Sequence, residues 1–163
     1  MLTLLAERRT LWLTFVATIL ITAAFPMAAS IWGISFIDGL SDPAAVRDAI
    51  AAMTPEQRVA HAWLTATLDV AYPLAYGALF AGSACAFFAR YGRLMALLLL
   101  VVVPIDLLEG VVQVLALTDT ADLIDTKAVL TPLKTALFLL GLAVTVAGWV
   151  VWVLRRFRRS QPS

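Results

Sequence analysis

Pro104-Ile105-Asp106-Leu107-Leu108-Glu109 lies inside an otherwise apolar run, residues 94–117, that is long enough to cross a lipid bilayer. Asp106 and Glu109 are three residues apart, so a helix places both carboxylates on one face. A charged side chain near the bilayer centre costs about 2.5–3.5 kcal/mol on insertion scales, and residues of this kind are usually functional. The stretch therefore predicts a membrane protein with a buried polar site.

The composition also indicates a membrane protein. Of the 163 residues, 62% are hydrophobic and 14% are charged, whereas a soluble domain has about 45–50% apolar and about 25% charged residues. We expect an all-α polytopic membrane protein that forms a single domain over residues 1–163, with four transmembrane helices in a bundle. The expected helices are about 10–34, 55–89, 94–117 and 127–154, with a short amphipathic external helix at about 43–53.

The single cysteine, Cys85, excludes an intrachain disulfide and with it a thiol oxidoreductase that needs paired cysteines. His61 is the only histidine, which makes a zinc site improbable, so we expect no metal ion. The sequence has no glycine-rich phosphate loop, and no cofactor is expected.

Basic residues are segregated along the chain and predict its orientation. The two ends and the loop near residue 92 carry eight arginines against one acid, a net charge of +7, whereas the two other connections carry three basic residues, among them Lys127, against seven acids, a net charge of −4. The positive-inside rule then places both termini in the cytoplasm. We expect a multi-pass protein of the cell membrane, most simply the bacterial inner membrane.

The short helix at 43–53 is expected to begin at an N-cap, Asp42, and has Val46, Ile50 and Met53 on one face. This pattern predicts a helix that lies along the membrane surface. The later external loop contains three acids at alternating intervals, Asp119, Asp122 and Asp125. It lacks the glycine and the terminal glutamate of a calcium-binding loop, so we interpret it as a solvated acidic loop.

Small and weakly polar residues recur at every fourth position of the first long helix: Thr14, Thr18, Thr22, Pro26 and Ser30. A seam of this kind lets two helices approach closely, and helix packing is its simplest explanation. The alternative is that Thr22 and Ser30 help to line the polar site.

A polar stripe runs along the helix expected at 55–89. Its members follow one another by four, four, three and four residues and share one face: His61, Thr65, Asp69, Tyr72 and Tyr76. Ordinary packing with satisfied hydroxyls would explain the tyrosines, but an acid inside a bilayer is functional by default. The first three members predict a hydrated route from outside to Asp69.

Three helices are expected to bring charge to one level of the membrane. At about 1.5 Å per residue, Asp69, Glu109 and Lys134 each lie roughly 9–12 Å from the external boundary. We therefore expect one shared site in the outer half of the bilayer. The candidate binding residues are Asp69, Asp106, Glu109, Lys134, Tyr72, Tyr76, His61 and Gln113.

The charge of this site is expected to be unbalanced, because three acids face one lysine within the membrane. Two close carboxylates cannot both be ionised without a partner, so we expect either a bound cation or one proton shared by Asp106 and Glu109. In that arrangement Asp106 holds the proton, and Glu109 faces Lys134 and the external opening.

Three functions are compatible with this pattern. The first is the binding or translocation of a proton, a cation or a small solute, for which four helices imply a homo-oligomer or a second membrane protein. The second is an accessory or assembly subunit that docks its polar face on a larger membrane complex. The third is an intramembrane enzyme that uses two carboxyl groups as an acid/base pair on a lipid-like substrate. The expected partners are membrane lipids and not nucleic acid.

Overall fold

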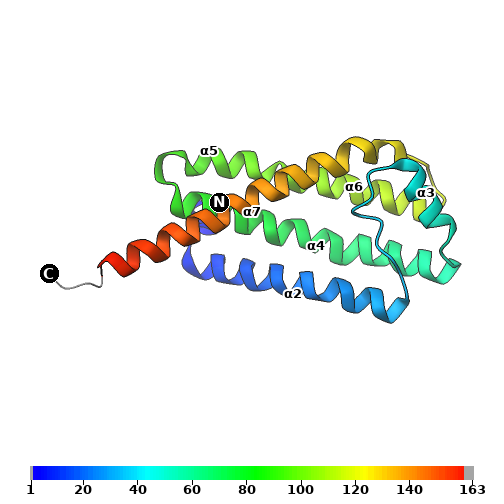
Figure 1. Ribbon diagram of the computed structural model, residues 1–163, viewed down its shortest axis with the longest axis horizontal. Coiled ribbons are helices and arrows are strands. Elements are labelled where there is room, and N and C mark those ends of the chain that lie inside the picture. The colour runs from blue at the N-terminus through cyan, green and yellow to red at the C-terminus, as the bar shows by residue number, and fades with distance from the viewer. Residues whose placement is uncertain (1, 160–163) are drawn as a thin grey trace.

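The computed structural model describes residues 2–159, and over that range the chain is built from helices without any strand (Figure 1). The elements in order are α1 (Leu2–Leu5), α2 (Arg8–Trp32), α3 (Pro43–Ala51), α4 (Pro55–Phe87), α5 (Ala89–Leu100), α6 (Val102–Leu117), η1 (Ile124–Thr126) and α7 (Lys127–Arg159). In the described part of the chain, four helical stretches are long and apolar enough to span a membrane: Arg8–Trp32, Pro55–Phe87, Arg90–Leu117 and Ile124–Phe157. The all-α class and the four membrane-length helices predicted from the sequence are confirmed.

Helix α4 is the central element of the structure. It packs against α1, α2, α5, α6 and α7, and Figure 1 shows α2 on one side of it and α5, α6 and α7 on the other. Helix α2 is peripheral, because Leu11 is its one buried residue. A helix that is apolar all round and faces outward is suited to contact with lipid.

The third membrane-length helix is not continuous, as the sequence had suggested for residues 94–117, but divides at Val101 into α5 and α6. Pro104 lacks a backbone N–H, so the normal bond to the carbonyl of Leu100 cannot form. The backbone tightens here, with the Val101 N–H donating to the Leu98 carbonyl at 3.3 Å. Helices α2 and α4 continue through their own prolines, Pro26 and Pro73.

Helix α3 closes one end of the molecule. The Asp42 carboxylate caps it by accepting a hydrogen bond from the Ala44 N–H at 3.1 Å, as the sequence predicts. Val46 and Ile50 are buried in a core with Ile37 and other residues from the ends of the long helices. The apolar face predicted from the sequence thus packs against the protein itself, and the position of α3 along a membrane surface stays a prediction.

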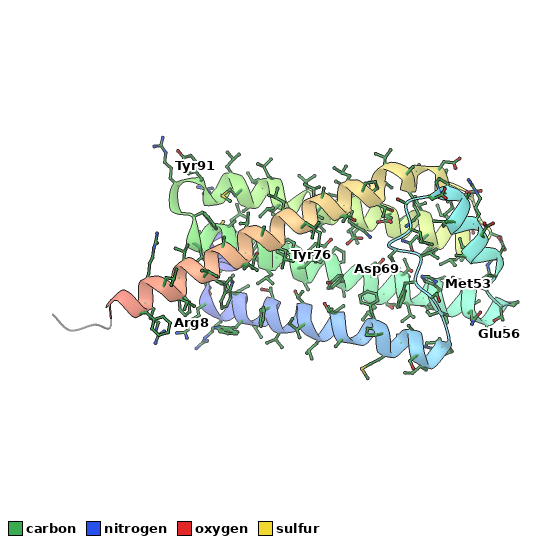
Figure 2. The ribbon with its side chains drawn as sticks, viewed as in Figure 1. Arg8, Met53, Glu56, Asp69, Tyr76 and Tyr91 are labelled. Atoms are coloured by element: carbon green, nitrogen blue, oxygen red, sulfur yellow. The ribbon has the colours of Figure 1, made fainter. Side chains whose placement is uncertain are left out.

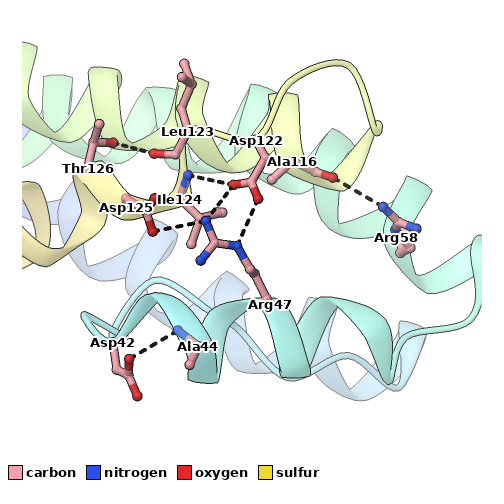
Figure 3. A network of polar contacts seen from close by, with 10 residues as sticks. All are labelled: Asp42, Ala44, Arg47, Arg58, Ala116, Asp122, Leu123, Ile124, Asp125 and Thr126. Carbon is pink, nitrogen blue, oxygen red and sulfur yellow. Dashed lines mark hydrogen bonds and ion pairs between the residues drawn. The ribbon is translucent and has the colours of Figure 1, made fainter.

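Ion pairs fasten α3 to the acidic loop before α7 (Figure 3). The Arg47 Nε lies 2.8 Å from Asp122 Oδ2, and its Nη2 lies 3.0 Å from Asp125 Oδ1. Arg58 of α4 pairs with Asp119 at 2.6 Å. The hydrogen bond from Arg47 lowers the pKa of Asp122 below its ordinary value. The loop is thus not merely solvated, because all three of its carboxylates are held by arginines.

Close contact between α4 and α7 generates a prediction about Gly141. A Cβ atom at this position would overlap the ring of Phe80, which is itself buried against Tyr76 and Phe138. We expect Gly141→Ala to destabilise the protein by about 1–3 kcal/mol, as overpacking does in a close-packed interior. The measurement is unfolding of the purified protein in detergent micelles.

Gly39→Ala is the matched control, because a Cβ there meets nothing within 4 Å. It should leave the unfolding midpoint unchanged, and Phe80→Leu should recover part of the loss in the Gly141→Ala background. Equal effects of the two glycine substitutions would contradict the close α4–α7 packing.

Candidate functional site

The carboxylate of Glu109, in α6, is fully enclosed by polar groups from α7. Lys127 Nζ and the Thr131 hydroxyl both donate to its Oε1 atom. Lys134 Nζ lies 2.5 Å from the other oxygen, Oε2. The three donors are spaced by four and three residues, so one face of α7 carries all of them.

Asp106 lies one turn away on the same face of α6 and extends the network. Lys134 Nζ is 3.1 Å from Asp106 Oδ1, so this ammonium group bridges the two carboxylates. The hydroxyl of Tyr76, from α4, donates to Asp106 Oδ2 at 2.6 Å. Three helices therefore contribute to one network of charge-assisted hydrogen bonds.

Lys127 corrects the predicted charge balance. The sequence placed it among the residues of the external connections, but its side chain is 0% exposed and pairs with Glu109. Two ammonium groups thus face Asp106 and Glu109, and the charges of these four side chains cancel. The shared proton expected on this pair is no longer required by the electrostatics.

A cavity of about 350 Å³ lies beside the network, between α2, α4 and α7 and under the loop that follows α2. Its lining is Phe25, Phe36, Asp38, Asp69, Tyr72, Tyr76, Asp106, Lys134, Thr135 and Phe138. Asp69 and Tyr76 project from α4 in this region (Figure 2). Glu109 does not line the cavity, so the expectation that it faces an external opening is wrong.

Asp69 faces two cavities. The second, of about 310 Å³, lies between α4 and α6, and its lining includes Thr65, Asp69, Asp106 and Gly110. Asp69 and Asp106 therefore form part of the wall between the two spaces. Among the described residues, no lysine, arginine or hydroxyl group is in hydrogen-bond or ion-pair contact with the Asp69 carboxylate, which instead adjoins the carboxyl group of Asp38.

Asp38 is a site residue that sequence reasoning missed. Helix α2 ends at Gly33, whose positive φ of 61° reverses the chain. Ile37, at 0% exposure, then anchors the returning loop in the core. This anchor places Asp38 against α6, where it accepts a hydrogen bond from Gln113 Nε2 at 3.1 Å. In the sequence, the apolar pair Phe36-Ile37 directly after a helix end indicates that this loop turns back into the core.

His61 and Thr65 do not form the predicted hydrated route, because both side chains are buried. His61 Nε2 is 4.0 Å from Asp38 Oδ2, and the imidazole ring packs edge-on against Phe36 with a centroid distance of 5.4 Å. Gln113 also contacts Asp38, so these two predicted site residues meet at a residue that was not predicted. The buried side chains of His61 and Thr65 therefore leave no route for water through the described residues on the side of the network nearest α3.

Tyr72 links the cavity to α2. The Thr22 hydroxyl lies 3.1 Å from the Tyr72 hydroxyl, but Thr22 is not part of the cavity lining. Like Thr14 and Thr18, Thr22 bonds to a backbone carbonyl of its own helix. Ser30 is exposed and lies outside the cavity lining.

Lys127 and Thr131 could have been found from the sequence. With Lys134 they follow the same four- and three-residue spacing that identified the stripe on α4. Among the residues that the structure describes, no group of three or more histidine, cysteine, aspartate or glutamate side chains is arranged to hold a metal ion. The residues of the site supply carboxylates, ammonium groups, hydroxyls and aromatic rings.

Comparisons of this chain with models of protein families, with curated proteins and with solved structures find no match. The function of the chain is accordingly inferred from its own residues.

Removing one partner of the Lys127–Glu109 pair should be strongly destabilising. Lys127→Met leaves a fully buried carboxylate with less compensation, and the loss of a buried partner costs about 3–5 kcal/mol. The double variant with Glu109→Gln should recover at least about 1 kcal/mol, a coupling typical of contacting residues. Unfolding of the four proteins in micelles measures the cycle.

The exposed pair Arg47 and Asp122 is the matched control. Arg47→Met and Asp122→Asn should show a smaller coupling, about 0–1 kcal/mol, because water and salt screen exposed ion pairs. Strictly additive losses for Lys127 and Glu109 would show that the buried contact does not stabilise the fold.

Proposed function

We propose that this chain is a small integral membrane protein that binds a proton, a cation or a small solute at a buried carboxylate–lysine site. The observation that carries the proposal is the cavity beside that site, with Asp38, Asp69, Asp106 and Lys134 all in its lining. Charged groups from three helices and a loop are thus gathered around a space that can hold a ligand. Small-molecule sites commonly combine an apolar cavity with a few convergent polar groups.

The distribution of charge supports binding of a positive species. Lys127 and Lys134 are matched by Asp106 and Glu109. Asp38 and Asp69 remain, and in the described part of the chain no lysine or arginine is paired with either. Ionised together, they would give the cavity a charge of −2, which attracts a proton or a cation.

The burial of the network argues against its use as a docking face. Glu109, Gln113 and Lys127 are all 0% exposed, so a partner protein could not contact them without unfolding the helix ends. An accessory subunit would instead have to dock through other surfaces, such as the exposed apolar side chains of α2. We propose that these side chains contact lipid or a second copy of the chain.

One enzymatic alternative is supported by a specific feature. Asp38 and Asp69 line the same cavity from different elements, and two carboxyl groups in different surroundings can serve as an acid and a base. A lipid-like substrate held beside them would suit an intramembrane acid/base enzyme. Binding remains the preferred proposal because it requires only the cavity and the charge.

The proposed orientation has both termini in the cytoplasm of a bacterial cell, with α3 and the acidic loop outside. Cysteines that replace Ala44 and Thr120 in a Cys85→Ala background should react with an impermeant thiol reagent added to intact cells, because both positions are exposed. A cysteine that replaces Arg93, exposed at the opposite end, should react only after the membrane is permeabilised. The reverse labelling pattern would overturn the orientation.

The binding proposal is tested by infrared difference spectroscopy on protein reconstituted in lipid. We expect carboxyl bands to change when the external buffer is exchanged between proton, sodium and organic solute conditions, because the Asp69 carboxylate faces the cavity. This signal should be lost in Asp69→Asn and kept in Asp48→Asn, which alters an exposed acid of α3 in the same way. Identical spectra for the wild type and Asp69→Asn under every condition would contradict binding at this site.

A further inference from the structure

We infer that the cavity between α2, α4 and α7 binds an organic ammonium ion that carries an apolar substituent, with its charge held by Asp38 and Asp69 and its apolar part among the aromatic rings. This inference rests on the proposed function and names the ligand class of that site. Five features of the site support it: the aromatic rings, the two carboxylates that pair with no lysine or arginine of the described residues, the buried polar groups around Asp38, the cavity volume and the direction of access.

Aromatic side chains make up five of the ten residues that line the cavity. Tyr72 lies at their centre, with ring-centroid distances of 5.5 Å to Phe25, 5.1 Å to Tyr76 and 6.5 Å to Phe138. Phe36 packs edge-on against Phe25 at 5.4 Å. Ring faces attract cations, most strongly away from water, and groups of aromatic residues bind alkylated ammonium ions for this reason.

The two carboxylates select a cation over a neutral or anionic molecule. Asp106 is already engaged by Lys134 and Tyr76, whereas Asp69 has no such contact among the described residues. Asp38 and Asp69 lie within electrostatic range of each other in the cavity lining. A positive group placed between them would relieve their mutual repulsion.

Buried polar groups around Asp38 give independent support. His61 and Gln113 are 0% exposed, yet both nitrogens of His61 and the Oε1 atom of Gln113 have no hydrogen-bond partner among the described residues. The His61 Nε2 atom is directed at Asp38 Oδ2, but at 4.0 Å it is too distant for a hydrogen bond. Buried groups left unpaired are rare, and both residues that carry them here lie against Asp38, although neither lines the cavity.

The volume and the wall chemistry favour an organic cation over a bare calcium or magnesium ion. At about 350 Å³ the cavity is far larger than one water molecule, which takes up about 30 Å³. Calcium and magnesium require about six or more oxygen ligands at short distance, and the aromatic rings provide none. A diffuse charge on a nitrogen with carbon substituents fits both the rings and the space.

Access to the cavity lies between α2 and α7. These helices meet near one end of the molecule, where the rings of Trp12 and Trp149 are 5.2 Å apart. Farther along, Phe25 and Phe138 each contact Tyr72 from α4. Thr135, which lines the cavity, is exposed on the outside of α7 at this level. The opening therefore faces the side of the helices, where lipid tails would accept the apolar part of a ligand.

The probe for this inference is benzyltrimethylammonium labelled with ¹³C in its methyl groups, added to the full chain in lipid nanodiscs. Nuclear magnetic resonance line broadening, corrected with empty nanodiscs, measures its binding. We expect saturable binding that weakens about tenfold or more in Asp69→Asn and in Asp38→Asn, because each removes a charge-assisted contact. Asp48→Asn, the same change at an exposed acid of α3, should bind as the wild type does.

Two further experiments test whether binding depends on the charge of the ligand and whether the ligand occupies this cavity. The neutral isostere 2,2-dimethylpropylbenzene and the anion benzylsulfonate should not displace the probe. Thr135→Trp keeps every carboxylate and changes an exposed residue, so it should fold normally and weaken binding by obstructing the opening. Displacement by the neutral isostere, or equal binding in Asp38→Asn, Asp69→Asn and the wild type, would overturn the inference.

The two proposals fail differently. If the infrared bands respond to protons or sodium and depend on Asp69, but benzyltrimethylammonium does not bind, the ligand class is wrong and the binding function stands. If no carboxyl band responds and the probe does not bind, both are wrong.

Discussion

The cost of removing charge from water governs this structure. Each ion buried in the interior costs several kcal/mol, and Coulomb attraction offsets that cost only when the geometry is good and the remaining hydrogen bonds are made. Here Glu109 is contacted by Lys127, Thr131 and Lys134, and Lys134 also contacts Asp106. These hydrogen bonds and ion pairs can form only when α6 and α7 lie side by side in one register. The network therefore specifies how these two helices pair, while α4 adds Tyr76 to fix the third.

The same constraint explains the closed end of the molecule. A network of this kind keeps its strength only where water is excluded, and α3 with the acidic loop provides that cover. Val46 and Ile50 fill the core beneath α3, and Arg47 holds the cover to Asp122 and Asp125 from outside. The exposed ion pairs thus hold α3 and the acidic loop in place. The buried ion pairs, in contrast, hold the long helices in place.

The sequence predicted most of the helices because apolar length and capping residues are local signals. The site was predicted in part, since Asp69, Asp106 and Lys134 stand out as charges in apolar runs. Lys127 was not assigned to the site because it lies at the first residue of its helix, although its spacing to Thr131 and Lys134 places all three on one face. Asp38 was missed because its position depends on Ile37 packing against residues distant in sequence, and the apolar pair Phe36-Ile37 is only a local sign of that packing. The break at Val101 could have been inferred from Pro104.

Paired and unpaired charges meet in the wall of the first cavity. All the matched groups come from helices, and the pair Glu109 and Lys127 is buried outside both cavities, whereas Asp106 and Lys134 also line the first cavity. The unmatched carboxylates face the cavity, and Asp38 is carried by the loop between α2 and α3, where one hydrogen bond from Gln113 restrains it. A loop residue can adjust its position to a ligand at little cost, whereas a helical residue in the network cannot. The wall of the first cavity therefore combines a fixed ion pair, Asp106 with Lys134, and a carboxylate carried by a loop, Asp38.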